Sequence, residues 1–161
     1  MPRTCLLILA FGLASTAAIA ADSLPPANAQ AAAFDPELAK KTGADERGMR
    51  RYVLVILKTG PTRMPDGAKR DAMFAGHFAN MERLAKEGKL ALAGPFAKDP
   101  DGWRGLFVFA VESIDEAKAL AATDPVIVNG EMVAEYHAWY ASAATMLIPE
   151  LHEKLQPPAP E

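Results

Sequence analysis

The run Tyr52–Leu57 constrains the fold of this chain more than any other segment. Its residues are all aliphatic or aromatic, and none of them is charged. A continuous apolar run of this length is typical of a β-strand that is covered on both faces. We therefore expect a sheet with this strand in its interior.

The segments that follow this run complete an alternation of helices and strands. In chain order we expect a helix from a cap at Asp66 to Glu87, a strand over Lys89–Phe96, a strand over Arg104–Val111, a helix over Ser113–Ala122 and a strand over Glu131–Trp139. The first helix has an apolar stripe at helical spacing, and the second begins with a capping box, in which Glu116 follows Ser113. This order of strands and helices is that of the α+β, ferredoxin-like split βαβ fold.

Two further helices are expected outside this pattern. One covers Pro36–Lys41 and is held against the domain by Phe34 and Leu38. The other is an extra C-terminal helix over Met146–Leu155, with Pro149 in its first turn.

A sheet with both helices on one face leaves its other face bare. Val53 and Val55 alternate with Leu54 and Ile56, so both faces of the first strand are apolar. Either the C-terminal helix or a second copy of the chain must cover the bare face. The size of the apolar patch favours a homodimer that pairs sheet against sheet.

The first twenty residues have the pattern of a signal peptide. Arg3 precedes an apolar stretch that begins at Cys5, and Ala18–Ala20 is the small-x-small pattern of a cleavage site. A retained membrane anchor is the alternative, but the apolar stretch is shorter than the roughly 20 residues that a span needs. We therefore expect an exported protein, periplasmic in a host with two membranes, with no membrane attachment after cleavage.

Composition divides the chain into a signal peptide at 1–20, a flexible N-terminal extension at 21–49, a compact domain at 50–155 and a disordered, Pro-rich tail at 156–161. The net charge of −3 is spread over both signs with no basic block, which argues against nucleic acid as a partner. The single cysteine, Cys5, excludes a disulfide scaffold and a zinc site with cysteine ligands.

A series of residues with ordered spacing lies between positions 52 and 140. In chain order it comprises His77, Gly88 eleven residues later, Gly94-Pro95, Gly102, Asp124-Pro125 and Gly130. In this order and spacing the chain resembles the YCII-related domain family. The resemblance implies a ferredoxin-like fold that dimerises into an open α+β barrel, with an active site built on a His–Asp pair that falls here on His77 and Asp124. The sequence departs from the family at Phe74, where an arginine is usual, and at Val126, where an aromatic residue is usual.

His77 and Asp124 each have a structural explanation beside the functional one. On a helical wheel His77 falls at the edge of the apolar stripe, which is also where a hydrogen-bonded core histidine lies. Asp124 before Pro125 is an ordinary helix cap. A carboxylate has two oxygens, so it can cap a helix and orient an imidazole together. The functional interpretation is a general acid/base, since imidazole changes its charge near neutral pH.

Five other residues are candidates for binding a ligand. Arg70 lies two turns before His77 on the same side of the helix, where it can act as an anion clamp or simply be solvated. Backbone N–H groups near Gly94 can stabilise a developing oxyanion. Tyr136, Trp139 and Tyr140 can line a pocket for an apolar or aromatic ligand, although packing is the commoner role.

The last strand carries Glu131, Glu135 and His137 at spacings of four and two. Carboxylates with an imidazole are able to hold a metal ion, but the same pattern describes a strand that faces solvent. We take the second interpretation and expect no metal and no cofactor.

Two functions fit these residues. The first is an exported, cofactor-free, dimeric enzyme in which His77 moves a proton on a small organic acid or ring compound, as in an isomerase, a lyase or a dehalogenating hydrolase, and Asp124 orients the imidazole. The second is a non-catalytic module of the same fold that binds a small ligand or a protein partner. The change at Phe74 favours the module, whereas the retention of both His77 and Asp124 favours the enzyme.

Overall fold

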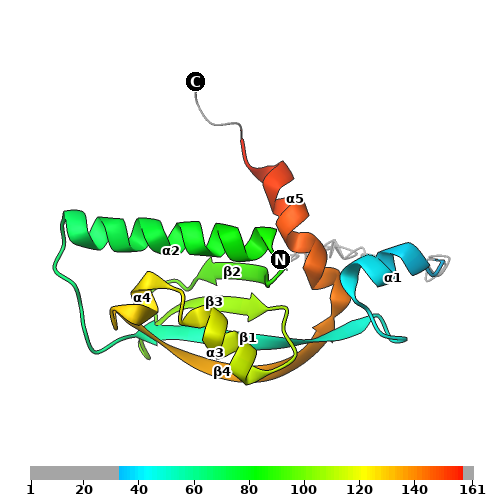
Figure 1. The fold of residues 1–161 in the computed structure, drawn as a ribbon, viewed down its shortest axis with the longest axis horizontal. Coiled ribbons are helices and arrows are strands. Elements are labelled where there is room, and N and C mark those ends of the chain that lie inside the picture. The colour runs from blue at the N-terminus through cyan, green and yellow to red at the C-terminus, as the bar shows by residue number, and fades with distance from the viewer. Residues whose placement is uncertain (1–32, 158–161) are drawn as a thin grey trace, which may run out of the picture. The chain divides into compact units, whose positions relative to one another are not determined.

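The structure of the protein is a computed structural model that describes residues 33–157 (Figure 1). In chain order its elements are α1 (Pro36–Thr42), β1 (Met49–Thr59), α2 (Ala68–Lys86), β2 (Leu90–Pro95), β3 (Trp103–Phe109), α3 (Ile114–Ala121), α4 (Pro125–Val128), β4 (Met132–Ser142), the 3-10 helix η1 (Ala143–Leu147) and α5 (Ile148–Leu155). The expected signal peptide lies outside the described residues, as does most of the expected tail. Within the described range no helix is both long and apolar enough to span a bilayer.

In the described part of the chain, four strands form one sheet in the order β2-β3-β1-β4, and every neighbouring pair is antiparallel. β1 is an interior strand, paired with β3 on one side and β4 on the other, as its apolar run predicts. This strand order, with α2 and α3 in the connections, is that of the split βαβ fold and confirms the predicted α+β class. In Figure 1, α2 lies along the sheet, and α4 packs beside it.

Side chains of β1 alternate between two apolar clusters. Val55 and Leu57 pack with Phe109 in the cluster beneath the helices, and each of the three is at most 2% exposed. Tyr52 packs with Val108 in a second cluster on the opposite face, and each is 1% exposed. Both faces of the strand therefore bury apolar side chains, which is the physical reason for its uninterrupted apolar sequence.

The two ends of α2 differ in how well the sequence predicts them. The helix ends before Gly88, whose φ of +68° lies in the left-handed region that glycine adopts without strain. At the other end the N-cap position belongs to Gly67, and no side chain caps the helix. The cap predicted at Asp66 is therefore wrong. The Asp66 side chain is 82% exposed and lies within salt-bridge distance of Arg63 and Arg70 instead.

α1 is the helix predicted in the N-terminal extension. Asp35 caps it by accepting a hydrogen bond from the Leu38 N–H at 3.0 Å. Its last residue, Thr42, is buried, and the Thr42 carbonyl accepts a hydrogen bond from Arg50 Nη1 at 2.9 Å. The Leu38 side chain, a predicted apolar anchor of this helix, is 42% exposed and so only partly buried. The helix packs against the segment Ala143–Leu147, and the bond from Arg50 ties its last turn to the start of β1.

The C-terminal segment is a 3-10 helix followed by α5 rather than one continuous helix. Met146 in η1 packs against the second cluster. Pro149 lies in the first turn of α5, as predicted. Leu151 and Leu155 are 52% and 81% exposed, and in Figure 1 α5 rises away from the sheet. The apolar side of α5 is therefore not buried on the sheet: the helix contacts β2, but none of its residues is buried.

Candidate active site

His77 lies in the middle of α2 on the side that faces the sheet. The buried residues of this helix are Met73, His77, Asn80 and Leu84, whose spacing of three or four places them on one face. The imidazole therefore lies against β3, and only 9% of the side chain is exposed. A buried polar ring in such a place needs a hydrogen-bond partner.

Asp124 supplies that partner. It is the N-cap of α4, it is fully buried, and its Oδ1 accepts a hydrogen bond from the Val126 N–H at 3.1 Å. His77 Nδ1 lies 2.9 Å and 2.8 Å from the two carboxylate oxygens. Asp124 thus caps a helix and orients the imidazole together, as the sequence allows. Because the ionised carboxylate only accepts, Nδ1 carries the proton, and Nε2 of the neutral ring keeps a lone pair.

Contacts on both sides of Asp124 hold it against α2. Before it, the Thr123 hydroxyl donates to Asn80 Oδ1 at 3.0 Å. After it, Pro125 lies against Gly76, where an added Cβ would be only 3.0 Å from Pro125 Cγ. A glycine allows this approach because it has no side chain to displace the proline. Both contacts come from the part of α2 that carries the imidazole, so they set the distance across the pair.

Three phenylalanine rings surround the imidazole. Phe74 meets it edge-on with a centroid separation of 6.2 Å, Phe78 is tilted at 5.4 Å, and Phe107 stacks at 6.0 Å with 29° between the planes. Phe107 is 3% exposed, whereas Phe78 is 59% exposed. The wall around His77 is therefore apolar, and it meets solvent at Phe78.

Arg70 has a partner that the sequence did not indicate. Its Nη2 donates to Glu131 Oε1 at 2.7 Å, and its guanidinium lies 4.7 Å from the centre of the Phe74 ring. Glu131 is 2% exposed and also accepts a hydrogen bond from the Met64 N–H at 2.8 Å. The bond from Arg70, and then that from Met64, lower the pKa of Glu131 against the opposing effect of burial. The charge of Arg70 is therefore balanced by a buried carboxylate, and only 17% of its side chain is exposed.

The remaining candidates do not gather around His77. Tyr136 packs in the cluster beneath the helices, whereas Trp139 packs against the Tyr52 ring at 5.9 Å on the opposite face. A pocket of one chain lined by both is therefore wrong, because residues three apart on a strand point to opposite faces. Gly94 is exposed where β2 pairs with β3, and none of the side-chain hydrogen bonds described for residues 33–157 joins it to His77.

The three residues considered for a metal site on the last strand lie in two separate places. Glu131 precedes β4 and is paired with Arg70. Glu135 accepts hydrogen bonds from Lys58 and, at 2.9 Å, from His137 Nε2. The part of the chain that the structure describes contains no group of three histidine, cysteine, aspartate or glutamate side chains placed to hold a metal ion.

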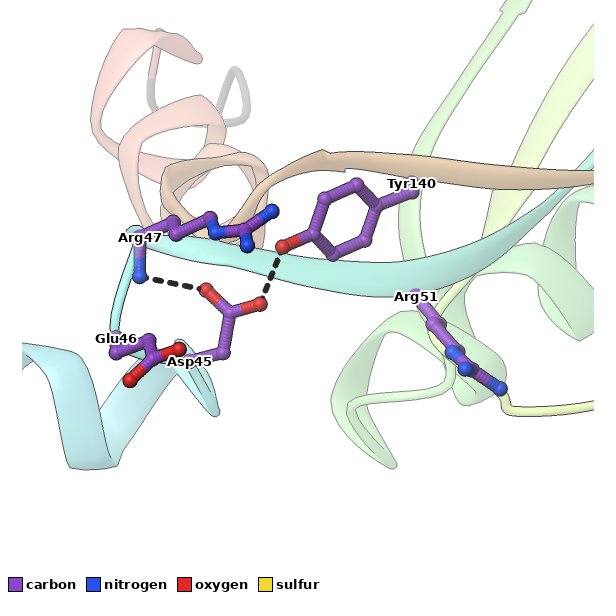
Figure 2. A pocket seen from close by; sticks show the side chains of 5 residues that line it. All are labelled: Asp45, Glu46, Arg47, Arg51 and Tyr140. Atoms are coloured by element: carbon purple, nitrogen blue, oxygen red, sulfur yellow. Dashed lines mark hydrogen bonds between the residues drawn. The ribbon is translucent and has the colours of Figure 1, made fainter.

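A hollow of about 670 Å³ lies elsewhere in the domain, away from His77 and Asp124, and among the candidate residues only Tyr140 lines it (Figure 2). Its lining residues are Asp45, Glu46, Arg47, Arg51 and Tyr140. Asp45 accepts hydrogen bonds from the Tyr140 hydroxyl and from the Arg47 N–H. The hydroxyl bond is the main reason that the pKa of Asp45 is lowered and that of Tyr140 is raised. These bonds tie the loop before β1 to β4.

Comparisons with known proteins find similarity over most of the domain. The model of the YCII-related domain matches residues 51–139, a range that includes both members of the His–Asp pair. The uncharacterized protein YjpA of Bacillus subtilis is 31% identical over 65 residues, which are 40% of this chain and 73% of that protein. The structure of a 5-chloro-2-hydroxyhydroquinone dehydrochlorinase from Burkholderia phenoliruptrix, in complex with 2,5-dihydroxybenzoquinone, is similar with a TM-score of 0.40. The two are 22% identical, over 54% of this chain and 92% of that chain.

Proposed function

The chain belongs to the YCII-related domain family, and from that premise we propose that it is a cofactor-free enzyme that acts on a small molecule. In this proposal His77 is the general acid/base and Asp124 orients its ring. The observation that supports it best is the buried pair itself, in which both carboxylate oxygens lie within 2.9 Å of Nδ1.

The reactive atom in this arrangement is Nε2 of His77. It removes a proton from the substrate, and the negative charge of Asp124 stabilises the imidazolium that forms. The same nitrogen then returns the proton to a different atom of the substrate or to a leaving group. Such transfer supplies about 10²–10⁴-fold of rate enhancement. Reactions of this kind include isomerisation, elimination by a lyase and dehalogenation of a small organic acid or ring compound.

The proposal extends to the assembly and location of the protein. Two copies would pair the sheet faces opposite α2, where Trp139 is 40% exposed and Leu54 is half-buried. This pairing would form the dimeric α+β barrel and cover the apolar surface that α5 leaves bare. Residues 1–20 would direct the chain out of the cytoplasm, to the periplasm of a host with two membranes.

A non-catalytic module that binds a small ligand is the second candidate. Its support is the burial of the imidazole, of which 9% is exposed, among three phenylalanine rings.

The variant Asp124→Asn separates these candidates. Asparagine caps a helix about as well as aspartate, so α4 should remain folded while the charge that orients His77 is lost. After a screen of carboxylated and halogenated aromatic compounds has given a substrate, we expect turnover to fall by about 10²–10⁴-fold in this variant. The matched control is Asp35→Asn at the cap of α1, which should leave turnover unchanged. Equal turnover in the wild type and in His77→Ala would remove His77 from the mechanism, and no turnover of any compound would favour the binding module.

A further inference from the structure

The hollow in Figure 2 is built largely by segments that lie outside the range matched by the family model. Its volume of about 670 Å³ is within the range of about 300–1,000 Å³ that is usual for small-molecule sites. Asp45, Glu46 and Arg47 belong to the loop between α1 and β1, and Tyr140 follows the matched range 51–139. Of the five lining residues, only Arg51 lies within that range. The hollow therefore depends on segments that this chain adds to the domain.

Hydrogen bonds hold one wall of this hollow in place. Asp45 Oδ1 accepts hydrogen bonds from the backbone N–H groups of Arg47 at 2.9 Å and of Met49 at 3.0 Å. Asp45 Oδ2 accepts a further bond from the Tyr140 hydroxyl. The Gly48 N–H donates to the Asp45 carbonyl at 2.9 Å, so the loop also closes on itself. A wall that is already ordered loses less conformational entropy when a ligand binds.

Three charged side chains of the hollow are left for a ligand. Within residues 33–157, no ion pair includes Glu46, Arg47 or Arg51, and all three are exposed. In Figure 2 the side chains of Arg51 and Glu46 lie on opposite sides of the hollow. The hollow thus offers an unpaired positive group on one side and an unpaired negative group on the other.

This arrangement favours a ligand that carries both signs of charge. The lining holds two arginines against one aspartate and one glutamate, so its charges sum to zero. A ligand with an anionic group alone is repelled by the acids, and one with a cationic group alone is repelled by the arginines. A guanidinium receives a carboxylate through two parallel hydrogen bonds, and a carboxylate receives an ammonium group. The Tyr140 ring, which is 46% exposed, adds a surface on which an apolar or aromatic group can pack.

We infer that this hollow binds a free α-amino acid whose side chain is apolar or aromatic. Arg51 binds the carboxylate of the ligand, Glu46 binds its ammonium group, and its side chain packs on the Tyr140 ring. The inference goes beyond the proposed function, because the hollow shares no residue with the His77–Asp124 pair.

The test compares L-phenylalanine with hydrocinnamate, which lacks the ammonium group, and with phenethylamine, which lacks the carboxylate. Binding to the full-length chain is followed by the backbone amide resonances of Glu46 and Arg47 and by the ring resonances of Tyr140. We expect L-phenylalanine to shift these resonances. Each analogue should bind about fivefold more weakly, because an exposed ion pair contributes up to about that factor.

Two variants that each remove one charge assign the two ends of the ligand. Arg51→Gln should weaken the binding of L-phenylalanine and hydrocinnamate about fivefold and leave phenethylamine no weaker. Glu46→Gln should weaken L-phenylalanine and phenethylamine by the same factor and leave hydrocinnamate no weaker. The matched controls Arg63→Gln and Glu153→Gln remove the same charges at exposed positions that do not line the hollow, and they should change none of the three affinities.

Three results would overturn the inference. The first is L-phenylalanine binding no more tightly than either analogue, and the second is no shift of the Glu46, Arg47 and Tyr140 resonances with any of the probes. The third is an unchanged affinity for L-phenylalanine in Arg51→Gln or Glu46→Gln, since these groups would then not hold the ligand. The role of His77 is tested separately by Asp124→Asn, so either proposal can fail without the other.

Discussion

The variant Gly76→Ala tests how the fold sets the distance between His77 and Asp124. The added Cβ lies 3.0 Å from Pro125 Cγ, whereas carbon atoms in contact prefer about 3.5–4.0 Å. Pro125 must therefore retreat by a few tenths of an ångström, and Asp124 moves with it as the preceding residue. The hydrogen bonds of 2.8 Å and 2.9 Å would then lengthen past about 3.2 Å, the end of the usual range.

The free energy of unfolding changes only modestly in Gly76→Ala, because two effects oppose each other. Replacing a glycine inside a helix by alanine stabilises the helix by about 1 kcal/mol. Overpacking against Pro125 costs about 1–3 kcal/mol. The net change in the free energy of unfolding is a loss of at most about 2 kcal/mol, so the variant should fold, with the His77–Asp124 contact weakened.

Side-chain ¹⁵N NMR of His77 measures this contact directly. In the wild type the Nδ1–H proton should be protected from exchange with water, and in Gly76→Ala it should exchange faster and shift upfield. The control is Gly88→Ala, which costs about 1–2 kcal/mol because the φ of +68° strains a side chain. No atom lies within 4 Å of that added Cβ, so the His77 resonances should not change. An unchanged Nδ1–H resonance in a folded Gly76→Ala would refute the argument that this contact positions Asp124.

Two further predictions concern stability. The pKa of Glu131 is lowered in the folded protein, so its ionisation stabilises the fold above its ordinary value of 4.5, and this contribution is lost as the pH falls through the folded pKa. Glu131→Gln should therefore lower the urea midpoint at pH 7 and make it less dependent on pH below 4.5; an identical dependence in the variant would contradict the pairing with Arg70. Phe109→Ala should cost about 3–5 kcal/mol of unfolding free energy, because this ring of β3 is 0% exposed in the cluster beneath the helices. Phe34→Ala, at a ring 79% exposed, should leave the midpoint unchanged.

Local patterns were sufficient for the order of the elements. The apolar run predicted an interior strand, and β1 is one. The capping box predicted the start of α3, where the Ser113 hydroxyl accepts a hydrogen bond from the Glu116 N–H at 3.2 Å. Gly88 predicted the end of α2. Each of these features depends on residues close in sequence, so the chain itself contains the information.

Strand ends were predicted less well than strand positions. β1 extends to Met49 and Thr59, beyond the apolar run, and β4 extends to Ser142. Main-chain hydrogen bonds between strands do not require apolar side chains, so pairing continues through polar residues such as Arg51 and Lys58. Side-chain composition alone cannot show where such pairing stops.

The sequence by itself determined the fold class, the family and the two residues worth attention, His77 and Asp124. Only the tertiary structure decided which groups meet. His77 and Asp124 are 47 positions apart, and Arg70 and Glu131 are 61 apart. Glu131 looks like Glu135 in the sequence, but the approach of α2 to the start of β4 buries one against a cation and leaves the other half exposed. Contacts of this kind depend on how the elements pack, so the residue pattern within any one element cannot predict them.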